Sequence, residues 1–351
     1  ALRCATQINP KRADLIIRLA NLLKISEEAS GVLRSMDLLL NVDQISNRDR
    51  WQAAVIYEEI HEYGRAMDIL MGVLGGNHTC APRLYLEIAR ISEKLGNLET
   101  AVDMVQMAID LLPQSMGLFA YQADLFSRLG KYDAAIACYK LAISMADPTS
   151  PKLDSPDFLE DINYPGGMGN AAWRTEIARQ DLIQYGYACL LRDLDHYQEA
   201  LEHAEDAVRL APDNPEFCYL AADLANSLLY EERAYHLLNV DRLLHIDQEQ
   251  KQSFLDCYGL AIEMLLSRND LPHADSLLAT VGEYVESEPR LLAASSRIHL
   301  RKGGHETARH ELDLALSMLK SRETDAATEV LPLWIGVAEI EFSNWKFGMD
   351  I

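Results

Sequence analysis

The sequence has few of the features that mark membrane-spanning, secreted or disulfide-bonded proteins. Its six cysteines are scattered through 351 residues without a CxxC pair. This spacing indicates reduced, small apolar residues rather than a disulfide framework or a zinc site. No apolar run reaches the roughly 18 residues needed to span a bilayer, and the opening ALRCATQINPKRAD lacks the apolar core of a signal peptide. We therefore expect a cytoplasmic chain without membrane insertion, with a nuclear location as the alternative.

Signatures of catalysis are also missing. The sequence contains no GxxxxGK[ST], HExxH or GxSxG, and YPGGMGN lacks both the preceding strand and the lysine of a phosphate-binding loop. His305 and His310 are five residues apart, about 140° around a helix, so they do not share a face as two metal ligands would. We expect no enzyme within these residues, and no cofactor or metal.

Basic residues are scarce relative to acidic ones. The chain has 32 Lys and Arg against 54 Asp and Glu, a formal charge of −22. This charge repels phosphate groups, which argues against a nucleic-acid partner or an anionic membrane surface. A protein or peptide segment is the expected partner.

One pattern recurs along most of the chain. LGNLETAVDMVQMAIDLLP begins at Leu95, and the similar LGKYDAAIACYKLAISMADP begins at Leu129. Successive units align on an alanine: Ala29, Ala66, Ala101, Ala135, Ala200, Ala234, Ala274 and Ala308. Most intervals between these alanines are close to the interval from Leu95 to Leu129, and the interval from Ala135 to Ala200 is nearly twice as long. A second alanine often precedes the first at a constant distance, as in Ala54, Ala89, Ala123, Ala188 and Ala222. A period of this length indicates stacked structural repeats.

The pattern resembles the tetratricopeptide repeat family, whose unit is a helix, a turn and a second antiparallel helix. The resemblance implies an all-α fold, a right-handed superhelical α-solenoid of about eight helix-turn-helix repeats plus a final helix near 331–343. The expected division is repeats one to four over 1–147, an acidic proline-rich insertion over 148–169, and over 170–351 an extended helix, repeats five to eight and a truncated ninth repeat. The match is weaker over 10–40 and in the unit ending near Ile246, where Asp241 occupies a usually small site.

The residue types explain the pattern physically. Apolar residues in 135–146 follow helical spacing and predict one buried stripe, while the alanines allow two helix backbones to approach where they cross. Gly96 and Gly130 are expected to adopt the left-handed conformation that ends a first helix. Four prolines are expected at the first position of a first helix, where a missing N–H costs nothing: Pro10, Pro82, Pro215 and Pro289.

The resemblance also implies that the first helices line a concave wall, with sites 2, 5, 9, 12 and 13 of each helix facing inward. Repeats six and seven place only acids at these sites and repeat eight only bases, so the wall is expected to read charge order in an extended peptide. The alternative is that these are solvated faces of ordinary helices. The charged candidates are Arg48, Arg83, Arg90, Asp124, Arg128, Arg192, Asp223, Glu263, Arg290, Arg297 and Arg301. Apolar anchors are Trp51, Leu86, Tyr185, Tyr219 and Leu266, with internal packing as their alternative.

Two further features bear on the partner. The clamp by which some members of this family hold the C-terminal carboxylate of chaperones requires Lys at site 5 and Asn at site 9, and no repeat here has this pair. The insertion, which contains four prolines, predicts either a disordered loop or a lid or handle that contacts a partner through Phe158, Tyr164 and the following Trp173.

The expected function is therefore that of a noncatalytic protein-interaction scaffold that binds a partner segment through the concave wall and the insertion. The alternative is a regulatory or targeting region of a larger enzyme or complex, whose catalytic part lies in further domains of a longer chain.

Overall fold

The computed structural model describes residues 12–26, 29–40, 45–74, 82–145, 179–240 and 251–322. Within these ranges all regular structure is helical, with sixteen α-helices, one 3-10 helix and no strand. The all-α prediction is confirmed. Among the helices of this part of the chain, none is both long and apolar enough to cross a membrane.

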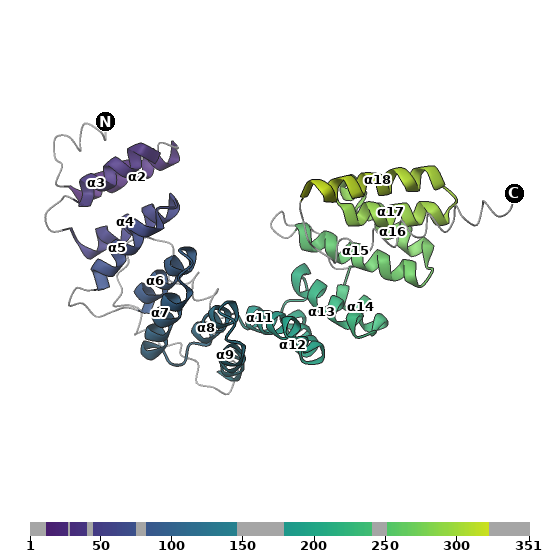
Figure 1. Ribbon diagram of the computed structural model, residues 1–351, viewed down its shortest axis with the longest axis horizontal. Helices are drawn as coiled ribbons and strands as arrows, with labels where there is room; N and C mark the ends of the chain where they lie inside the picture. The colour runs from purple at the N-terminus through teal and green to yellow at the C-terminus, as the bar shows by residue number, and fades with distance from the viewer. Residues whose placement is uncertain are drawn as a thin grey trace. The chain divides into compact units, whose positions relative to one another are not determined.

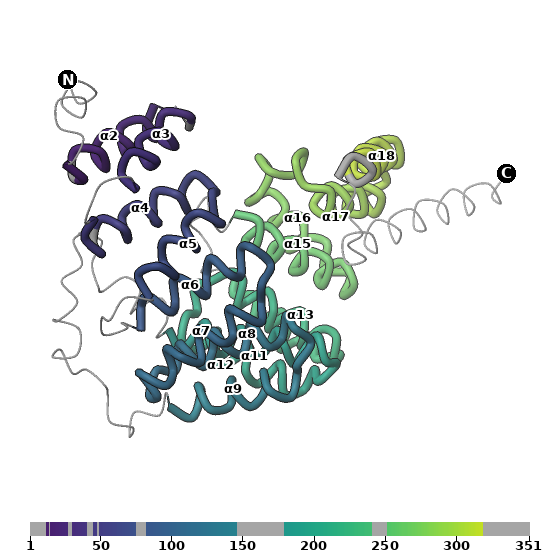
Figure 2. Tube along the Cα trace, turned by 60° about the vertical axis from the view of Figure 1, so that its left-hand side comes forward, coloured from purple at the N-terminus to yellow at the C-terminus, as the bar shows by residue number. Residues whose placement is uncertain are grey.

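The helices form eight consecutive hairpins, each a first helix beside an antiparallel second helix (Figures 1 and 2). They belong to two compact units, Ala1–Ile183 and Gln184–Ile351. The pairs of the first unit are α2 (Ala13–Ile25) with α3 (Ala29–Leu40), α4 (Asn47–Glu59) with α5 (Tyr63–Leu74), α6 (Pro82–Lys94) with α7 (Leu98–Leu111), and α8 (Met116–Arg128) with α9 (Tyr132–Met145). The boundary falls inside α11 (Gln180–Asp193), most of which belongs to the second unit. The pairs of that unit are α11 with α12 (Tyr197–Leu210), α13 (Pro215–Ser227) with α14 (Glu231–Leu238), α15 (Lys251–Ser267) with α16 (Leu271–Thr280), and, after the 3-10 helix η3 (Gly282–Ser287), α17 (Pro289–Arg301) with α18 (His305–Arg322).

The recurring alanines lie where the helices cross. All seven anchor alanines whose side chains are described are fully buried: Ala66, Ala101, Ala135, Ala200, Ala234, Ala274 and Ala308. The alanines that precede them, on the first helices, are buried as well: Ala54, Ala89, Ala123, Ala188 and Ala222. A small side chain at both contact points brings the two backbones close, and larger residues fill the space beside them. The predicted role of the alanines is confirmed.

The hydrophobic core of the first unit runs from hairpin to hairpin. One cluster extends from Ile16 to Ile91, and a second from Tyr85 to Leu125. Leu74 and Met104 pack against both clusters. Each hairpin therefore buries apolar residues against its neighbours as well as between its own two helices, as stacked repeats require.

The turn inside seven of the hairpins has a common backbone conformation. The residue five positions before the anchor alanine has φ between 60° and 86°: His61, Gly96, Gly130, Asp195, Leu229, Asn269 and Gly303. The prediction for Gly96 and Gly130 is confirmed. Because only three of the seven residues are glycine, the packing of the two helices imposes this conformation even where the residue does not favour it.

Helix ends follow local sequence. Pro82, Pro215 and Pro289 are the first residues of α6, α13 and α17, as predicted, while Pro10 lies outside the described residues. The second helix of repeat six is short. It ends at Leu238, where Asn239 adopts a left-handed conformation and its side-chain Nδ2 donates to the carbonyl of Pro212 at 3.2 Å.

Several predictions concern residues that the structure does not describe. These are the insertion over 148–169, the extension of the following helix upstream of Arg179, the unusual Asp241 and the final helix near 331–343. They stay predictions.

Candidate partner-binding face

Each first helix has one side packed on its second helix and one side turned away from it. We call the latter side the first-helix face; the resemblance predicts the concave wall there. In α4, α6 and α8 a buried alanine is followed directly by an exposed residue, because adjacent residues lie about 100° apart around a helix. Val55 is 39% exposed, and the side chains of Arg90 and Asp124 are 57% and 53% exposed. These three residues form an exposed row at one position of three successive repeats.

The predicted apolar anchors of the first unit do not share this exposure. Trp51 and Leu86 are both buried. The guanidinium of Arg83 lies over the Trp51 ring, 5.7 Å from its centroid. These side chains contribute to packing inside the unit, and the exposed surface of the face is formed by Val55 and by charged neighbours such as Arg90 and Asp124.

Contacts between successive first helices in this unit centre on Glu93. The Tyr121 hydroxyl donates to Glu93 Oε2 at 2.8 Å, and Arg128 pairs with Glu93 and, at 3.8 Å, with Asp124. Tyr121 and Arg128 follow Glu93 by 28 and 35 residues, close to one repeat, which is why they meet it on the next first helix. Burial raises the pKa of Asp124, and the opposing effect of Arg128 is smaller.

Sequence reasoning missed two residues of this face, Tyr121 and Glu87. Glu87 lies between Arg83 and Arg90, with N–O distances of 3.8 and 3.9 Å. Burial raises the pKa of its carboxyl, while Arg90 lowers it by less. Both missed residues come directly after a site-5 residue. One more inward position per helix in the counting scheme would have included them.

In the second unit one arginine joins three first helices. Arg290 of α17 donates from Nε and Nη2 to the two carboxylate oxygens of Glu263 in α15, at 2.9 and 3.1 Å. Its Nη1 donates to the hydroxyl of Tyr219 in α13 at 3.1 Å. The Arg290 and Glu263 side chains are only 15% and 18% exposed. Burial alone would lower the pKa of Arg290, but Glu263 and Tyr219 outweigh it and the pKa is raised.

Space for this arginine comes from a glycine in the middle of α15. A Cβ added at Gly259 would lie 3.0 Å from Arg290 Cδ and 3.2 Å from its Nε. The Arg290 side chain, which comes from repeat eight, therefore passes over α15 of repeat seven at Gly259, where no side chain blocks it. A buried bidentate pair of this kind holds its partners firmly, since removing either leaves an uncompensated charge.

Other predicted residues of the second unit are also engaged within the chain. Arg301 donates to the Leu266 carbonyl at 2.5 Å, Arg192 pairs with Asp193 at 3.0 Å, and Tyr185 stacks on Phe217 at 4.9 Å. Arg297 and Leu266 are buried. Burial raises the pKa of the half-buried Asp223, opposed by Arg290 and Arg192.

The predicted site residues therefore fall into two groups: Arg90 and Asp124 of the first unit are exposed, whereas Glu263 and Arg290 of the second are paired with each other. Opposite charges at Glu263 and Arg290, expected to read a partner's charge order, neutralise each other across the two repeats. The side chain of Arg48 and all of Phe158, Tyr164 and Trp173 lie outside the described residues.

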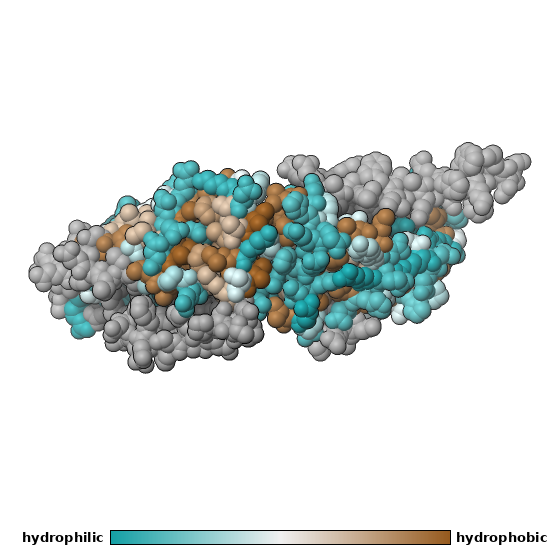
Figure 3. Space-filling view, turned by 90° about the horizontal axis from the view of Figure 1, so that it is seen from below, coloured by the Kyte–Doolittle hydropathy of each residue, from teal (hydrophilic) through white to brown (hydrophobic). Residues whose placement is uncertain are grey.

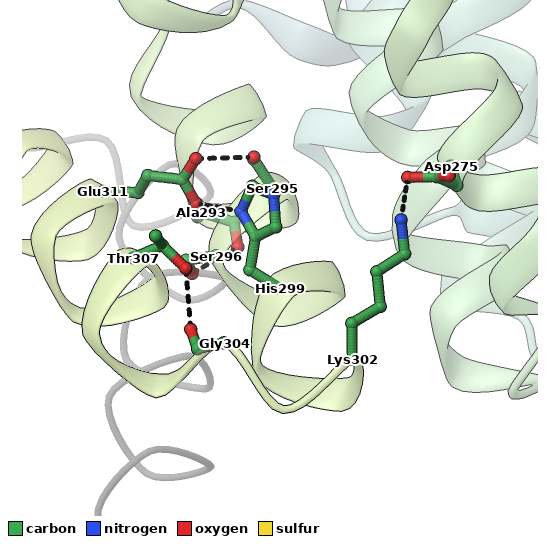
Figure 4. A network of polar contacts seen from close by, with 9 residues as sticks. All are labelled: Asp275, Ala293, Ser295, Ser296, His299, Lys302, Gly304, Thr307 and Glu311. Atoms are coloured by element: carbon green, nitrogen blue, oxygen red, sulfur yellow. Dashed lines mark hydrogen bonds and ion pairs between the residues drawn. The ribbon is translucent and has the colours of Figure 1, made fainter.

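A cluster in repeat eight has the residue types of a catalytic triad (Figure 4). Ser295 Oγ donates to Glu311 Oε1 at 3.0 Å, and His299 Nδ1 is 2.8 Å from Glu311 Oε2. A nucleophilic serine is activated by a base that binds its hydroxyl, and here the carboxylate binds both groups instead. The network joins α17 to α18, and Lys302, the residue that follows α17, pairs with Asp275 of α16 at 2.6 Å. Within the ranges described above, no three His, Cys, Asp or Glu side chains are grouped as a metal site.

Comparison with known proteins identifies the repeat. A model of the tetratricopeptide repeat matches residues 122–148 and 183–214. These stretches cover most of two hairpins whose anchor alanines, Ala135 and Ala200, are fully buried. The chain therefore contains tetratricopeptide repeats in these two stretches. No significant similarity to a curated protein sequence was found.

Solved tetratricopeptide repeat structures are similar over much of this chain. A tetratricopeptide repeat protein from Parabacteroides merdae is 12% identical and has a TM-score of 0.47, with coverage of 83% of this chain and 98% of its own. PilF from Pseudomonas aeruginosa is 15% identical, with a TM-score of 0.47 and coverage of 74% and 97%. YrrB, described as a TPR protein with an unusual peptide-binding site, is 18% identical, with a TM-score of 0.41 and coverage of 66% and 98%.

Proposed function

We propose that this tetratricopeptide repeat protein is a noncatalytic scaffold that binds an extended segment of a partner protein along the first-helix face of repeats two to four. The observation that carries this proposal is the exposed row of Val55, Arg90 and Asp124 on three successive first helices. Residues repeated at one position of stacked hairpins present a ladder of contacts to an extended chain, which is how solenoids form long binding surfaces.

The first unit suits this role better than the second because its side chains are available. At the corresponding positions of the last two repeats, Glu263 is held by Arg290 and Arg297 is only 8% exposed. A partner that displaced Arg290 from Glu263 would break a buried ion pair, which is costly. Arg90 and Asp124 need no such rearrangement, because their own side chains are more than half exposed and their ion pairs, at 3.8 to 3.9 Å, are long.

The chemistry of the row favours a partner segment that carries both charges. Arg90 offers a guanidinium that matches a carboxylate, and Asp124 offers a carboxylate one repeat further on. Val55 adds an apolar contact one repeat before Arg90. Charges in this arrangement set the direction and register of a bound segment more than its affinity.

The test is selection of binders from a random-peptide display library on the whole chain, followed by affinity measurements with the selected peptides. We expect Arg90→Glu to weaken binding about tenfold or more, as expected for reversing a close charge pair. The unfolding midpoint should fall only slightly, because Glu87 loses Arg90 but keeps Arg83. The control is Lys140→Glu, which reverses an exposed charge on the second helix α9 and should leave affinity unchanged. Peptides that bind Arg90→Glu and Asp124→Lys as well as the unaltered chain would contradict the proposal.

A further inference from the structure

The turn inside repeat six departs from the other hairpin turns. Of the seven residues with positive φ at this position, six are Gly, Asn, Asp or His, and one is Leu229 with φ of 63°. Glycine has no steric penalty in this conformation, and Asn and Asp tolerate it through local hydrogen bonding. Leucine has neither advantage, so the backbone is strained at Leu229. Backbone strain at one member of a repeated set is a sign to look for function.

The side chain of Leu229 is also in an unfavourable environment for its type. It is 83% exposed, more than any other large apolar side chain in the described part of the chain. The neighbouring Tyr230 is exposed too, and an open hollow of about 500 Å³ is lined there by residues 229–233. Figure 3 shows apolar surface in patches among hydrophilic surface on one face of the molecule, so outward apolar side chains are not confined to this turn. Leu229 differs in combining exposure with backbone strain.

Charges around the turn are mainly negative. Glu231 and Glu232 share a single cation, Arg268, at 3.7 and 3.2 Å. The Glu232 side chain is 82% exposed. Arg233 does not offset this charge, because it is paired with Glu205 at 2.5 Å. The strained Leu229 and its neighbour Tyr230 are thus followed by two carboxylates that share one arginine.

We propose that residues 229–232 form a second docking site, distinct from the first-helix face, for a partner-protein segment in which an apolar side chain lies next to Lys or Arg. The apolar side chain contacts Leu229 and Tyr230, and the basic one pairs with Glu232. Burying the leucine recovers apolar surface that the free chain leaves in water. This inference rests on the proposed function only in that the partner is a protein.

The experiment uses the same random-peptide selection on the whole chain, with variants at the turn. In Leu229→Gly the side chain is lost and the strain is relieved, so we expect affinity for one class of selected peptides to fall about tenfold. The thermal unfolding midpoint should meanwhile rise by about 2 °C. His61→Gly, the same change in repeat two, should raise the midpoint and leave affinity unchanged. Because the first variant is more stable than the unaltered chain, misfolding cannot explain its lost binding.

Two more measurements sharpen the result. Leu229→Asn keeps a residue suited to the turn but removes the apolar contact, so it should lose affinity to a similar degree. Glu232→Lys should weaken the same peptides, and those peptides should be enriched in Lys or Arg beside an apolar residue. The inference is overturned if every selected peptide binds Leu229→Gly normally while some depend on Arg90, and the proposed function then stands. If no peptide is selected at all, both fail.

Discussion

The first helices of the two units belong to the same kind of repeat but differ in how exposed their charged side chains are. In the first unit, Arg90 and Asp124 have side chains more than half exposed. In the second, Glu263 and Arg290 have side chains that are 18% and 15% exposed and bind each other. The comparison shows that the position of the bridging side chains decides whether the middle of a first-helix face is exposed to solvent or covered. The buried alanines between the helices are alike in both units.

The difference arises from the positions of a few side chains. In the first unit Arg128 and Tyr121 of α8 both reach Glu93, near the C-terminal end of α6, and this bridge leaves Arg90 and Asp124 exposed. In the second, Arg290 lies at the start of α17 and reaches Glu263 and Tyr219 across Gly259. A bridge over the middle of the face occupies the surface that a partner would use.

The largest expected effect comes from removing that bridge. Arg290→Met leaves the Glu263 carboxylate buried without its partner, and we expect a loss of about 3 kcal/mol in the unfolding free energy. Arg90→Met, its counterpart in the open face, should change stability by less than about 0.5 kcal/mol. Urea unfolding measures both, and hydrogen exchange should show loosening of α13, α15 and α17. Equal losses in the two variants would break the comparison.

A smaller effect is expected at the glycines. Gly259→Ala places a Cβ against Arg290, and we expect a net loss of about 1 kcal/mol from this overpacking. In α5 of the first unit, a Cβ added at Gly72 would have no atom within 4 Å. Gly72→Ala should therefore gain about 0.5–1 kcal/mol from helix propensity alone. Thermal unfolding of the two variants should shift in opposite directions, and a gain at both positions would show that Arg290 moves aside freely.

The hairpin turns offer a third contrast of similar size. Gly130→Ala in the first unit forces a side chain into a left-handed conformation, at a cost of about 1 kcal/mol. Leu229→Gly in the second unit reverses this change and should gain a comparable amount. Comparing melting midpoints of the two variants tests whether the turn conformation is held alike in both units.

The smallest effect concerns pH. Burial raises the pKa of Asp223 in the folded protein, so the folded state binds more protons than the unfolded state between the ordinary aspartate pKa and the raised value. Stability from this group is therefore lost as pH rises through that window. Asp223→Asn should make the protein slightly more stable than the unaltered chain at pH 7, and the difference should shrink near pH 4, where the Asp223 carboxyl becomes protonated in the unfolded state as well. Unfolding midpoints at the two pH values check this, and a difference that grows on acidification would contradict it.

The sequence predicted the fold more completely than it predicted the contacts on the first-helix face. The alanine spacing predicted the hairpins and their contact points, and seven buried anchor alanines confirm it. The prediction succeeded because close packing of two helices requires a small residue at the same position of every repeat, so alanines recur in the sequence at the repeat spacing. Glycine in the sequence predicted the left-handed turn residue in only some hairpins. His61, Asp195, Leu229 and Asn269 adopt the same conformation because of how their helices pack.

Spacing alone established that this protein is a stack of helical hairpins with one face of first helices left over, because burial of the same stripe once in every repeat admits few other arrangements. It could not show which charges on that face are already paired. Arg290 and Tyr219 are 71 residues apart and meet only because α15 brings a glycine between them. Contacts between side chains of different repeats depend on reach and on the space left by a third helix, and those are properties of the packed structure.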